Sequence, residues 1–249
     1  RDTGNQNTQA ITFDGSEDMQ PDFVCIKQRA DDGYSHELFD VVRGVTKYVC
    51  ADTNAAEATG STTLTAFGSD GFTLGADTIV NKNTKTYVAW NWKAGGSASS
   101  NSNGSITSSV SASTTAGISI VSYTGTGATA TIGHGLGAAP KMVIVKQRNT
   151  TRNWVVMHQG IGFTKYLYLD STQASNTGNF FNDTDPSSTV FNVVNDGGVN
   201  ASSGSYIAYC FAPIKGYSKF GNYTGNGNAD GTFIHTGFSP AFVLLKNVD

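Results

Sequence analysis

Short apolar runs separated by polar turns dominate the chain, and they predict β-strands rather than helices. The runs at 24–26, 142–145 and 242–245 are continuously apolar and close on a lysine, a pattern typical of strands buried on both faces. A proline opens each of these segments, where a strand needs no backbone donor. The segment 118–123 partly alternates between apolar and polar residues, as a half-exposed strand does.

Two aromatic-rich segments, 87–92 and 206–211, predict further strands that fill the space between packed sheets. Turn signals such as Asp70-Gly71 separate the strands, and 52–58 has room for one helical turn at most. Many short strands without helices between them predict antiparallel sheets packed face to face. We therefore predict an all-β fold of tandem antiparallel β-sandwich modules, jelly-roll-like in architecture.

An internal repeat organises these strands. The string PDFVCIKQR begins at Pro21, PKMVIVKQR begins at Pro140, and PAFVLLKN begins the same pattern a third time at Pro240. Later landmarks keep their spacing, since Tyr87 and Tyr206 each lie 66 residues after the proline of their copy. Conserved spacing of this kind indicates structural units arranged in tandem.

The repeat divides the chain into four parts. We expect a first β module at 1–94, a second at 118–216, and the start of a third, truncated module at 217–249. The stretch 95–117 is rich in Gly, Ser and Thr, the composition of an insertion or flexible linker. Its two large apolar residues allow part of it to form an edge strand. Each module is expected to bury a core of its own, with the joints propagating the array.

Composition and charge narrow the class of partner. The chain of 249 residues has 16 Lys and Arg against 19 Asp and Glu, a formal net charge of −3. This charge provides no field to attract nucleic acid or anionic lipid. No stretch approaches the roughly 20 apolar residues that cross a bilayer as a helix. We therefore expect neither a nucleic-acid partner nor membrane insertion.

The three cysteines do not predict a disulfide framework. Cys25, Cys50 and Cys210 each lie in an apolar run, where a free cysteine behaves as a small buried hydrophobic residue. The sequence has no CxxC motif and no Cys/His cluster with metal-ligand spacing. We expect free thiols and no cofactor.

Polar side chains provide one weak metal candidate and one structural pair. Asn226, Asn228 and Asp230 have the alternating oxygen spacing of a calcium loop, but the closing carboxylate is missing. A tight turn is therefore the favoured interpretation of this loop. Asp40 and Arg43 are spaced for a structural ion pair, which the second copy does not repeat.

Catalytic motifs are missing from the sequence. His134 and His235 recur in the loop before a repeat proline, but no Ser, Cys or carboxylate keeps a fixed spacing to them. This favours a loop-stabilising role over that of a general base. The sequence contains neither a GxSxG elbow nor an HExxH motif. We predict no catalytic residue, and hence a protein that is not an enzyme.

Aromatic side chains are the candidates for ligand binding, because they can stack on sugar rings. Trp90 and Trp92 recur as aromatic residues in the second copy, which favours core packing. Tyr34 and Trp154 lie in a region that differs between the copies, where a tandem protein varies its binding surface. Tyr34 and Trp154 are therefore the predicted ligand-binding residues.

Several strings resemble a known group of proteins across essentially the whole chain: PDFVCIKQR, FDVVRGVTKY, SDGFTLG, TYVAWNWKAGG, GHGLGAAPKMVIVK and TGFSPAFVLLK. They are similar to the repeated module of large, tail-fibre-like virion proteins of marine tailed phages. The resemblance implies a virion structural protein, a tail fibre or surface adhesin outside the cell. It implies self-association, other virion proteins or a host surface glycan as partners. The group has no established catalytic motif, so no functional residue carries over.

Three alternatives remain open at this point. Exposed coplanar aromatic residues on one loop face would favour a carbohydrate-binding module of a phage depolymerase. A groove with two facing carboxylates would favour a glycan-cleaving enzyme. Extensive apolar burial between copies would favour an extracellular surface-filament subunit.

Overall fold

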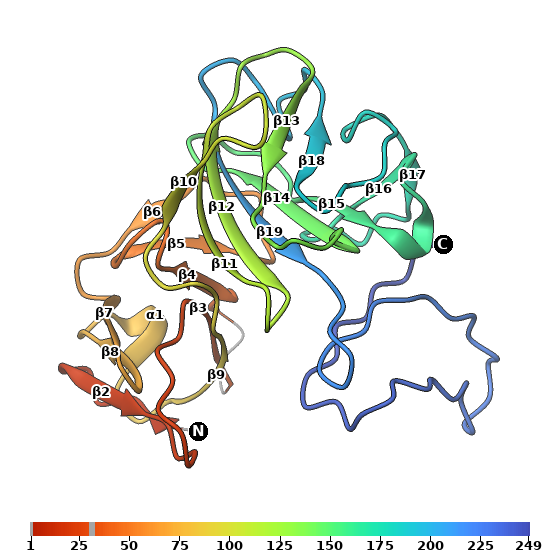
Figure 1. The fold of residues 1–249 in the computed structure, drawn as a ribbon. Coiled ribbons are helices and arrows are strands. Elements are labelled where there is room, and N and C mark those ends of the chain that lie inside the picture. Colours follow the sequence, from red (N-terminus) through yellow and green to blue (C-terminus); the bar gives the residue numbers. More distant parts are fainter. Residues whose placement is uncertain (1, 30–32) are drawn as a thin grey trace.

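The computed structural model describes residues 2–29 and 33–249, and strands make up nearly all of its regular structure (Figure 1). Helical structure in the described residues is limited to α1 (Thr78–Asn81) and the 3-10 turn η1 (Gln159–Ile161). Within these residues, no helix has the length and apolar character needed to span a membrane. The predicted all-β, sandwich-type fold is confirmed.

The first repeat forms a large sheet covered on one face by a small one, and all strand pairs are antiparallel. In spatial order, the large sheet contains β1 (Asp2–Thr3), β9 (Thr86–Trp92), β3 (Phe23–Gln28), β4 (Glu37–Asp40), β5 (Lys47–Cys50) and β6 (Ala58–Thr59). The small sheet contains β2 (Gln9–Thr12), β8 (Gly71–Leu74) and β7 (Leu64–Gly68). The core between the two sheets includes Val24, Ile26, Phe39, Leu64, Phe72 and Val80.

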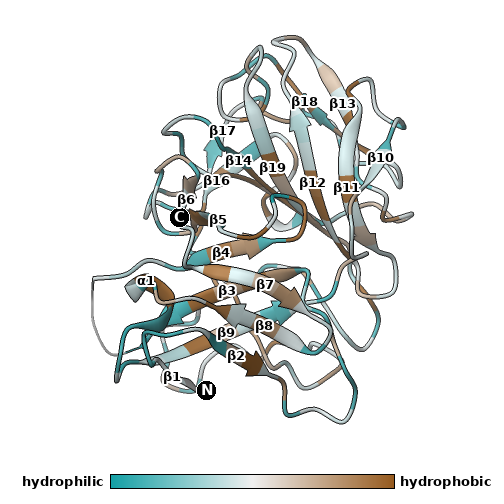
Figure 2. Cartoon of the chain, turned by 90° about the vertical axis from the view of Figure 1, so that its left-hand side faces the viewer, coloured by the Kyte–Doolittle hydropathy of each residue, from teal (hydrophilic) through white to brown (hydrophobic). Residues whose placement is uncertain are grey.

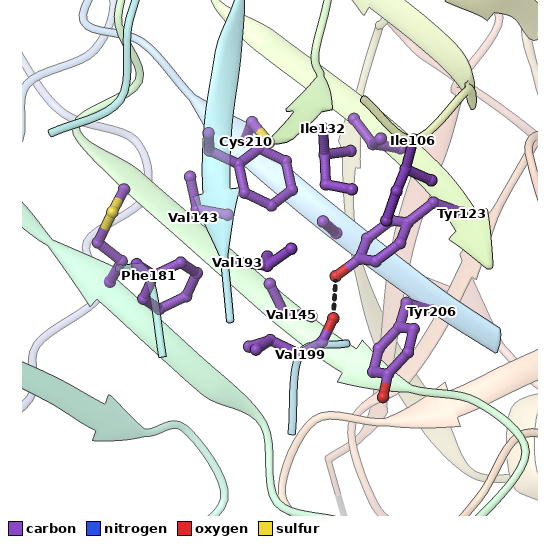
Figure 3. Close-up of a cluster of buried hydrophobic side chains, with 14 of the residues drawn as sticks. Ile106, Tyr123, Ile132, Val143, Val145, Phe181, Val193, Val199, Tyr206 and Cys210 are labelled. Carbon is purple, nitrogen blue, oxygen red and sulfur yellow. Dashed lines mark hydrogen bonds between the residues drawn. The ribbon is translucent and has the colours of Figure 1, made fainter. Parts of the chain in front are cut away.

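The second repeat has the same plan, with more strands in its large sheet. In spatial order, that sheet contains β10 (Ser99–Asn101), β11 (Ser108–Ser113), β12 (Ile118–Thr124), β19 (Ser205–Phe211), β14 (Met142–Gln147), β15 (Val155–His158), β16 (Lys165–Tyr168) and β17 (Asn176–Thr177). The strands β13 (Ala130–Gly133) and β18 (Val190–Val193) cover one face of it. Figure 3 shows the core enclosed there, in which the hydroxyl of Tyr123 donates to the carbonyl oxygen of Val199 at 2.6 Å.

The Gly- and Ser-rich stretch between the modules contributes ordered strands. β11 pairs with β12 from Ser109 to Ser113, and β10 pairs with β11 at the edge of the large sheet. The two large apolar residues, Ile106 and Val110, are buried in the core of the second repeat. The expected edge strand is therefore confirmed.

Equivalent asparagines stabilise the same turn in both repeats. The Oδ1 atom of Asn81 accepts a hydrogen bond from the backbone amide of Asn5 at 2.9 Å. In the second repeat, Oδ1 of Asn200 accepts one from the amide of Thr126 at 2.8 Å. Both asparagine side chains are buried and also donate to backbone carbonyls. Each one therefore fixes the start of its repeat against the segment that precedes the last strand.

Equivalent tyrosines act beside these asparagines. The hydroxyl of Tyr87 donates to the carbonyl oxygen of Thr78 at 3.0 Å, and that of Tyr206 donates to the carbonyl oxygen of Gly197 at 2.9 Å. The repeat therefore extends from the sequence to individual hydrogen bonds.

A third core lies between the modules, because the two large sheets face each other (Figure 2). The first repeat contributes Phe23, Leu38, Val49 and Ala94 to this core, and the second contributes Ile118, Ile120, Ile144, Trp154, Val156, Leu167, Ile207 and Tyr209. The central strands β3 and β14 are consequently buried on both faces, as their apolar runs predict. The expectation that each module buries its own core is incomplete, since this third core is shared.

The predicted strand at 242–245 does not form. Residues 217–249 contain no strand, and Ser218 makes one isolated bridge with Ile214. Figure 1 shows this last segment as an extended chain beside the sheets. The counterpart of 242–245 in the second repeat is β14, which pairs with β15 and β19. Among the described residues, no strand pairs with 242–245, so its backbone lacks the partners that make β14 a strand.

We expect Asn81→Ala and Asn200→Ala each to lower the free energy of unfolding by about 2–3 kcal/mol, because each leaves buried backbone groups unpaired. Urea titration followed by intrinsic fluorescence measures this loss. Asn103→Ala, at an exposed position, is the matched control and should change stability little. Equal stability of all three variants would contradict the role assigned to these asparagines.

Candidate functional site

The structure places Trp154 inside the joint between the modules. Its side chain is 0% exposed, and the indole Nε1 donates to the carbonyl oxygens of Cys50 at 2.9 Å and Thr53 at 3.2 Å. A ring covered in this way cannot stack on a sugar from solvent. The prediction that Trp154 binds a ligand is therefore wrong, because the first module covers this part of the second.

Tyr34 lies elsewhere and is half-buried. Its hydroxyl donates to Oγ1 of Thr78 at 3.2 Å, and its carbonyl oxygen accepts from Nζ of Lys27 at 2.6 Å. Nζ of Lys82 lies 5.8 Å from the ring centroid. Tyr34 is thus held against α1, whereas Trp154 contacts the segment after β5, so they do not form one aromatic platform. Ligand binding at Tyr34 stays a prediction.

The candidate calcium loop forms consecutive turns closed by its own side chains. Oδ1 of Asn226 accepts from the amide of Asn228 at 3.1 Å, and Oδ1 of Asn228 accepts from the amide of Asp230 at 3.0 Å. These bonds are the tight turn that the sequence favours. Across 2–29 and 33–249, no group of three or more His, Cys, Asp or Glu side chains is placed to hold a metal ion.

The recurring histidine and the cysteines are placed as structural rather than reactive side chains. Nδ1 of the buried His134 accepts from the amide of Leu136 at 3.2 Å, and burial lowers the pKa of this histidine. Its neutral ring therefore stabilises the loop before the repeat proline. Cys25, Cys50 and Cys210 are free thiols, as predicted. Burial raises the pKa of Cys25 and of Cys50 to about 12, so both stay protonated near neutral pH.

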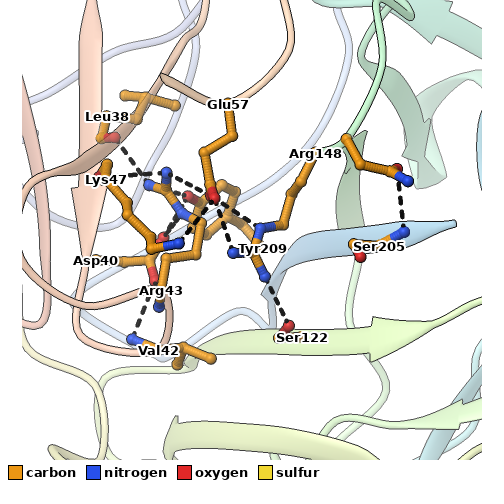
Figure 4. A network of polar contacts seen from close by, with 11 residues as sticks. Leu38, Asp40, Val42, Arg43, Lys47, Glu57, Ser122, Arg148, Ser205 and Tyr209 are labelled. Carbon is orange, nitrogen blue, oxygen red and sulfur yellow. Dashed lines mark hydrogen bonds and ion pairs between the residues drawn. The ribbon is translucent and has the colours of Figure 1, made fainter. Parts of the chain in front are cut away.

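The most organised polar site is a network at the joint between the modules (Figure 4). Its centre is an ion pair in which Nε of Arg43 lies 2.5 Å from Oδ2 of Asp40, with both side chains 0% exposed. The pair forms where β4 ends in a turn, because Oδ1 of Asp40 accepts from the amides of Val42 and Arg43 at 3.0 and 2.8 Å. Gly44 completes the turn at φ +85°, a conformation that side chains disfavour.

The second module supplies the remaining partner of this ion pair. The hydroxyl of Tyr209, on β19, donates to Oδ2 of Asp40 at 2.8 Å and accepts from Nη2 of Arg43 at 3.3 Å. Burial raises the pKa of Tyr209 well above its ordinary value, so the hydroxyl keeps its proton. A buried ion pair is costly unless hydrogen bonds satisfy its remaining donors and acceptors. Tyr209 satisfies them only when the two modules are docked.

Glu57 extends the network toward the surface. Its carboxylate accepts from Nε and Nη2 of Arg148 at 2.8 and 2.9 Å, a two-point contact between the modules. Nη1 of Arg43 lies 3.6 Å from the same carboxylate, and Nζ of Lys47 lies 3.7 Å from it. Glu57 is thus surrounded by positive charges from both repeats, and such two-point contacts fix orientation as well as distance.

The loop after β5 completes the joint through its backbone. Nζ of Lys146, which is fully buried, donates to the carbonyl oxygen of Asn54 at 2.9 Å and to that of Arg152. The amide of Glu57 donates to the carbonyl oxygen of Arg148 at 2.8 Å. Burial lowers the pKa of Lys146 to about 8. The joint therefore combines an apolar core, an ion-pair network and backbone hydrogen bonds.

Sequence reasoning identifies Asp40 and Arg43 as a pair but misses their partners. Glu57 and Arg148 are 91 residues apart, and no local pattern relates them. Asp40, Arg43 and Glu57 carry one available signal, since charges present in only one copy of a repeat mark positions where the copies differ in their contacts. The network joins residues of both modules through ion pairs and hydrogen bonds.

Another buried carboxylate, that of Glu37, lies at the start of β4. Its Oε2 atom lies 3.2 Å from Sγ of Cys50, and burial raises its pKa to about 7. The folded protein therefore keeps this proton to a higher pH than the unfolded chain, whose ordinary value is 4.5. Stability from this group is fully present below about pH 4.5 and is lost as the pH rises through about 7.

We expect Tyr209→Phe to lower the free energy of unfolding by about 1–3 kcal/mol, because it removes one hydroxyl from the buried ion pair. Tyr217→Phe, at a 53% exposed position, serves as the control and should be neutral. Thermal and urea unfolding of both variants measure the difference. A neutral Tyr209→Phe would show that the hydroxyl contributes nothing to the joint.

Glu37→Gln is expected to stabilise the protein by about 1–3 kcal/mol at pH 8 and to have little effect at pH 4.5. Glutamine keeps an acceptor for Cys50 but carries no charge that burial disfavours. Urea titrations at both pH values measure this dependence, with the exposed Glu17→Gln as control. A stabilisation that is equal at the two pH values would contradict the titration of Glu37.

No curated protein and no solved structure matches the chain. One family model, described as a domain of unknown function (DUF7483), matches residues 2–249 and so covers both modules and the segment after them. The chain therefore belongs to the DUF7483 family.

Proposed function

We propose that this chain is a non-enzymatic structural protein of a phage virion, of the tail-fibre or surface-adhesin type. The observation that supports this role is the buried contact of Asp40 and Arg43 with Tyr209 of the following module. A contact of this kind makes the joint rigid, because any other orientation of the modules leaves two charges unsatisfied. A rigid joint between tandem modules suits a structural part of a virion.

The shared core supports the same proposal. The large sheets bury apolar side chains of both repeats, and inter-domain contacts that are large and apolar suppress relative motion. The resemblance of the sequence to phage virion modules adds the location, on the particle and outside the cell. Self-association, other virion proteins and a host surface glycan are the proposed partners, with Tyr34 as the residue to test for a glycan.

Antibodies raised against residues 1–249 test this proposal on particles of the phage that encodes the chain. We expect immunogold electron microscopy to label the tail or surface of purified virions, and mass spectrometry to detect the chain in the same particles. Pre-immune serum is the control. Detection only in lysates of infected cells, with none in purified particles, would contradict a virion role.

A further inference from the structure

We propose that the repeated module closes into a ring of three around a shared apolar axis. Residues 217–249 are then the opening part of the third module, and the face of the first module around Trp90 and His36 is where the rest of that module docks. This inference concerns assembly of the modules and does not depend on the location of the protein in a virion. Three independent comparisons between equivalent positions support it.

The joint between the first two modules recurs between the second module and the last segment. Lys146 and Lys246 each lie six residues after a repeat proline. Nζ of Lys146 donates to the carbonyl oxygen of Asn54 in the loop after β5, and Nζ of Lys246 donates to that of Ser171 in the loop after β16. β5 and β16 are equivalent strands of the first and second repeats. Each lysine therefore binds the equivalent loop of the module before it.

A backbone hydrogen bond recurs at the same two joints. The amide of Glu57 donates to the carbonyl oxygen of Arg148 at 2.8 Å, and the amide of Ser175 donates to that of Val248 at 3.0 Å. Arg148 and Val248 each lie eight residues after a repeat proline. The last segment thus docks on the second module as the second docks on the first.

The last segment also returns to the first module through an aromatic contact. The ring centroids of Phe23 and Tyr209 lie 4.6 Å apart across the joint from the first module to the second. Phe242 is the counterpart of Phe23, since each lies two residues after a repeat proline, and Trp90 is the counterpart of Tyr209. The centroids of Phe242 and Trp90 lie 5.9 Å apart. The third unit therefore contacts the first through the same pair of equivalent positions, and in the same direction, as the first contacts the second.

These contacts determine the symmetry of the arrangement. A head-to-tail contact generates an open array unless its rotation closes, and closure brings the last unit back to the first. In an open array, the third unit would touch only the second. Here it touches the second through Lys246 and the first through Phe242, so the contact closes after three modules.

The aromatic stack on this face of the first module resembles the stack at the joint, but it is less completely covered. His36 stacks on Trp90 with centroids 6.5 Å apart and planes at 21°, as Trp154 stacks on Tyr209 at 6.3 Å and 23°. Trp154 is fully covered by the first module, whereas the side chain of His36 is 42% exposed. A third module would cover His36 with the loop equivalent to the one that covers Trp154.

The apolar run of the last segment is also incompletely covered. Val243 and Leu245 are 61% and 66% exposed, whereas their counterparts Val143 and Val145 are fully buried in β14. Contiguous exposed apolar residues mark surfaces that another element covers. The remaining strands of a third module would supply that cover.

Cross-linking of the 249-residue chain tests the closing contact. Cys25 and Cys50 are replaced by serine, and a short bis-maleimide is applied to the Trp90→Cys/Phe242→Cys variant. We expect an intramolecular cross-link in the monomer. The pair Trp90→Cys/Phe233→Cys is the negative control, since Phe233 is 86% exposed. Absence of the 90–242 cross-link, or cross-links only between two chains, would overturn the ring.

A second pair keeps the test valid if the Trp90 variant does not fold. Ser175→Cys/Val248→Cys probes the recurring joint and should also cross-link within one chain. Hydrogen exchange then tests whether a completed third module covers the face around Trp90 and His36. The chain used is extended after Asn247 with a copy of residues 148–216. We expect exchange at 34–37 and 243–245 to slow at least tenfold in a monomer. A folded extension that leaves 34–37 unprotected, or that dimerises, would overturn the assignment of this face. The cross-linking and hydrogen-exchange results are independent of the virion-labelling experiment, so failure of the ring and failure of the proposed function can be told apart.

Discussion

The contact of Asp40 and Arg43 with Tyr209 is the constraint on which the arrangement of the two modules depends. Two opposite charges lie without solvent between sheets from different repeats, and a hydroxyl from the second repeat meets both of them. The apolar core around the pair supplies the larger part of the burial, but apolar contacts have no direction. The ion pair supplies the direction, since its hydrogen bonds are satisfied in only one register of the two sheets.

The layers follow from this constraint. Each large sheet must be apolar on both faces, one toward its own small sheet and one toward the neighbouring module. That requirement explains why β3 and β14 are continuous apolar runs rather than alternating ones. It also explains why Lys146 at the end of β14 is buried, since the loop of the first module lies over it and supplies a carbonyl acceptor.

Local features of the fold could be predicted from the sequence, whereas the joint could not. The strands, the repeat and the edge strand within 95–117 depend on short apolar patterns and turn residues. The pairing of Glu57 with Arg148 depends on how two sheets dock, and no local pattern contains that information. Trp154 illustrates the same limit, because its place in a variable region does not show that its ring points into the joint. The strand predicted at 242–245 requires neighbours that its own sequence cannot supply.

The short edge strands β10 and β17 have a consequence for solubility. A stack of open sheets presents unpaired backbone groups at its edges, and such edges pair with other chains. In the second repeat, the outermost strand at one edge is three residues of Ser and Asn, and at the other edge it is the two residues of β17. Polar edges this short offer few groups for lateral pairing, so protein made of these modules should resist aggregation through its sheet edges.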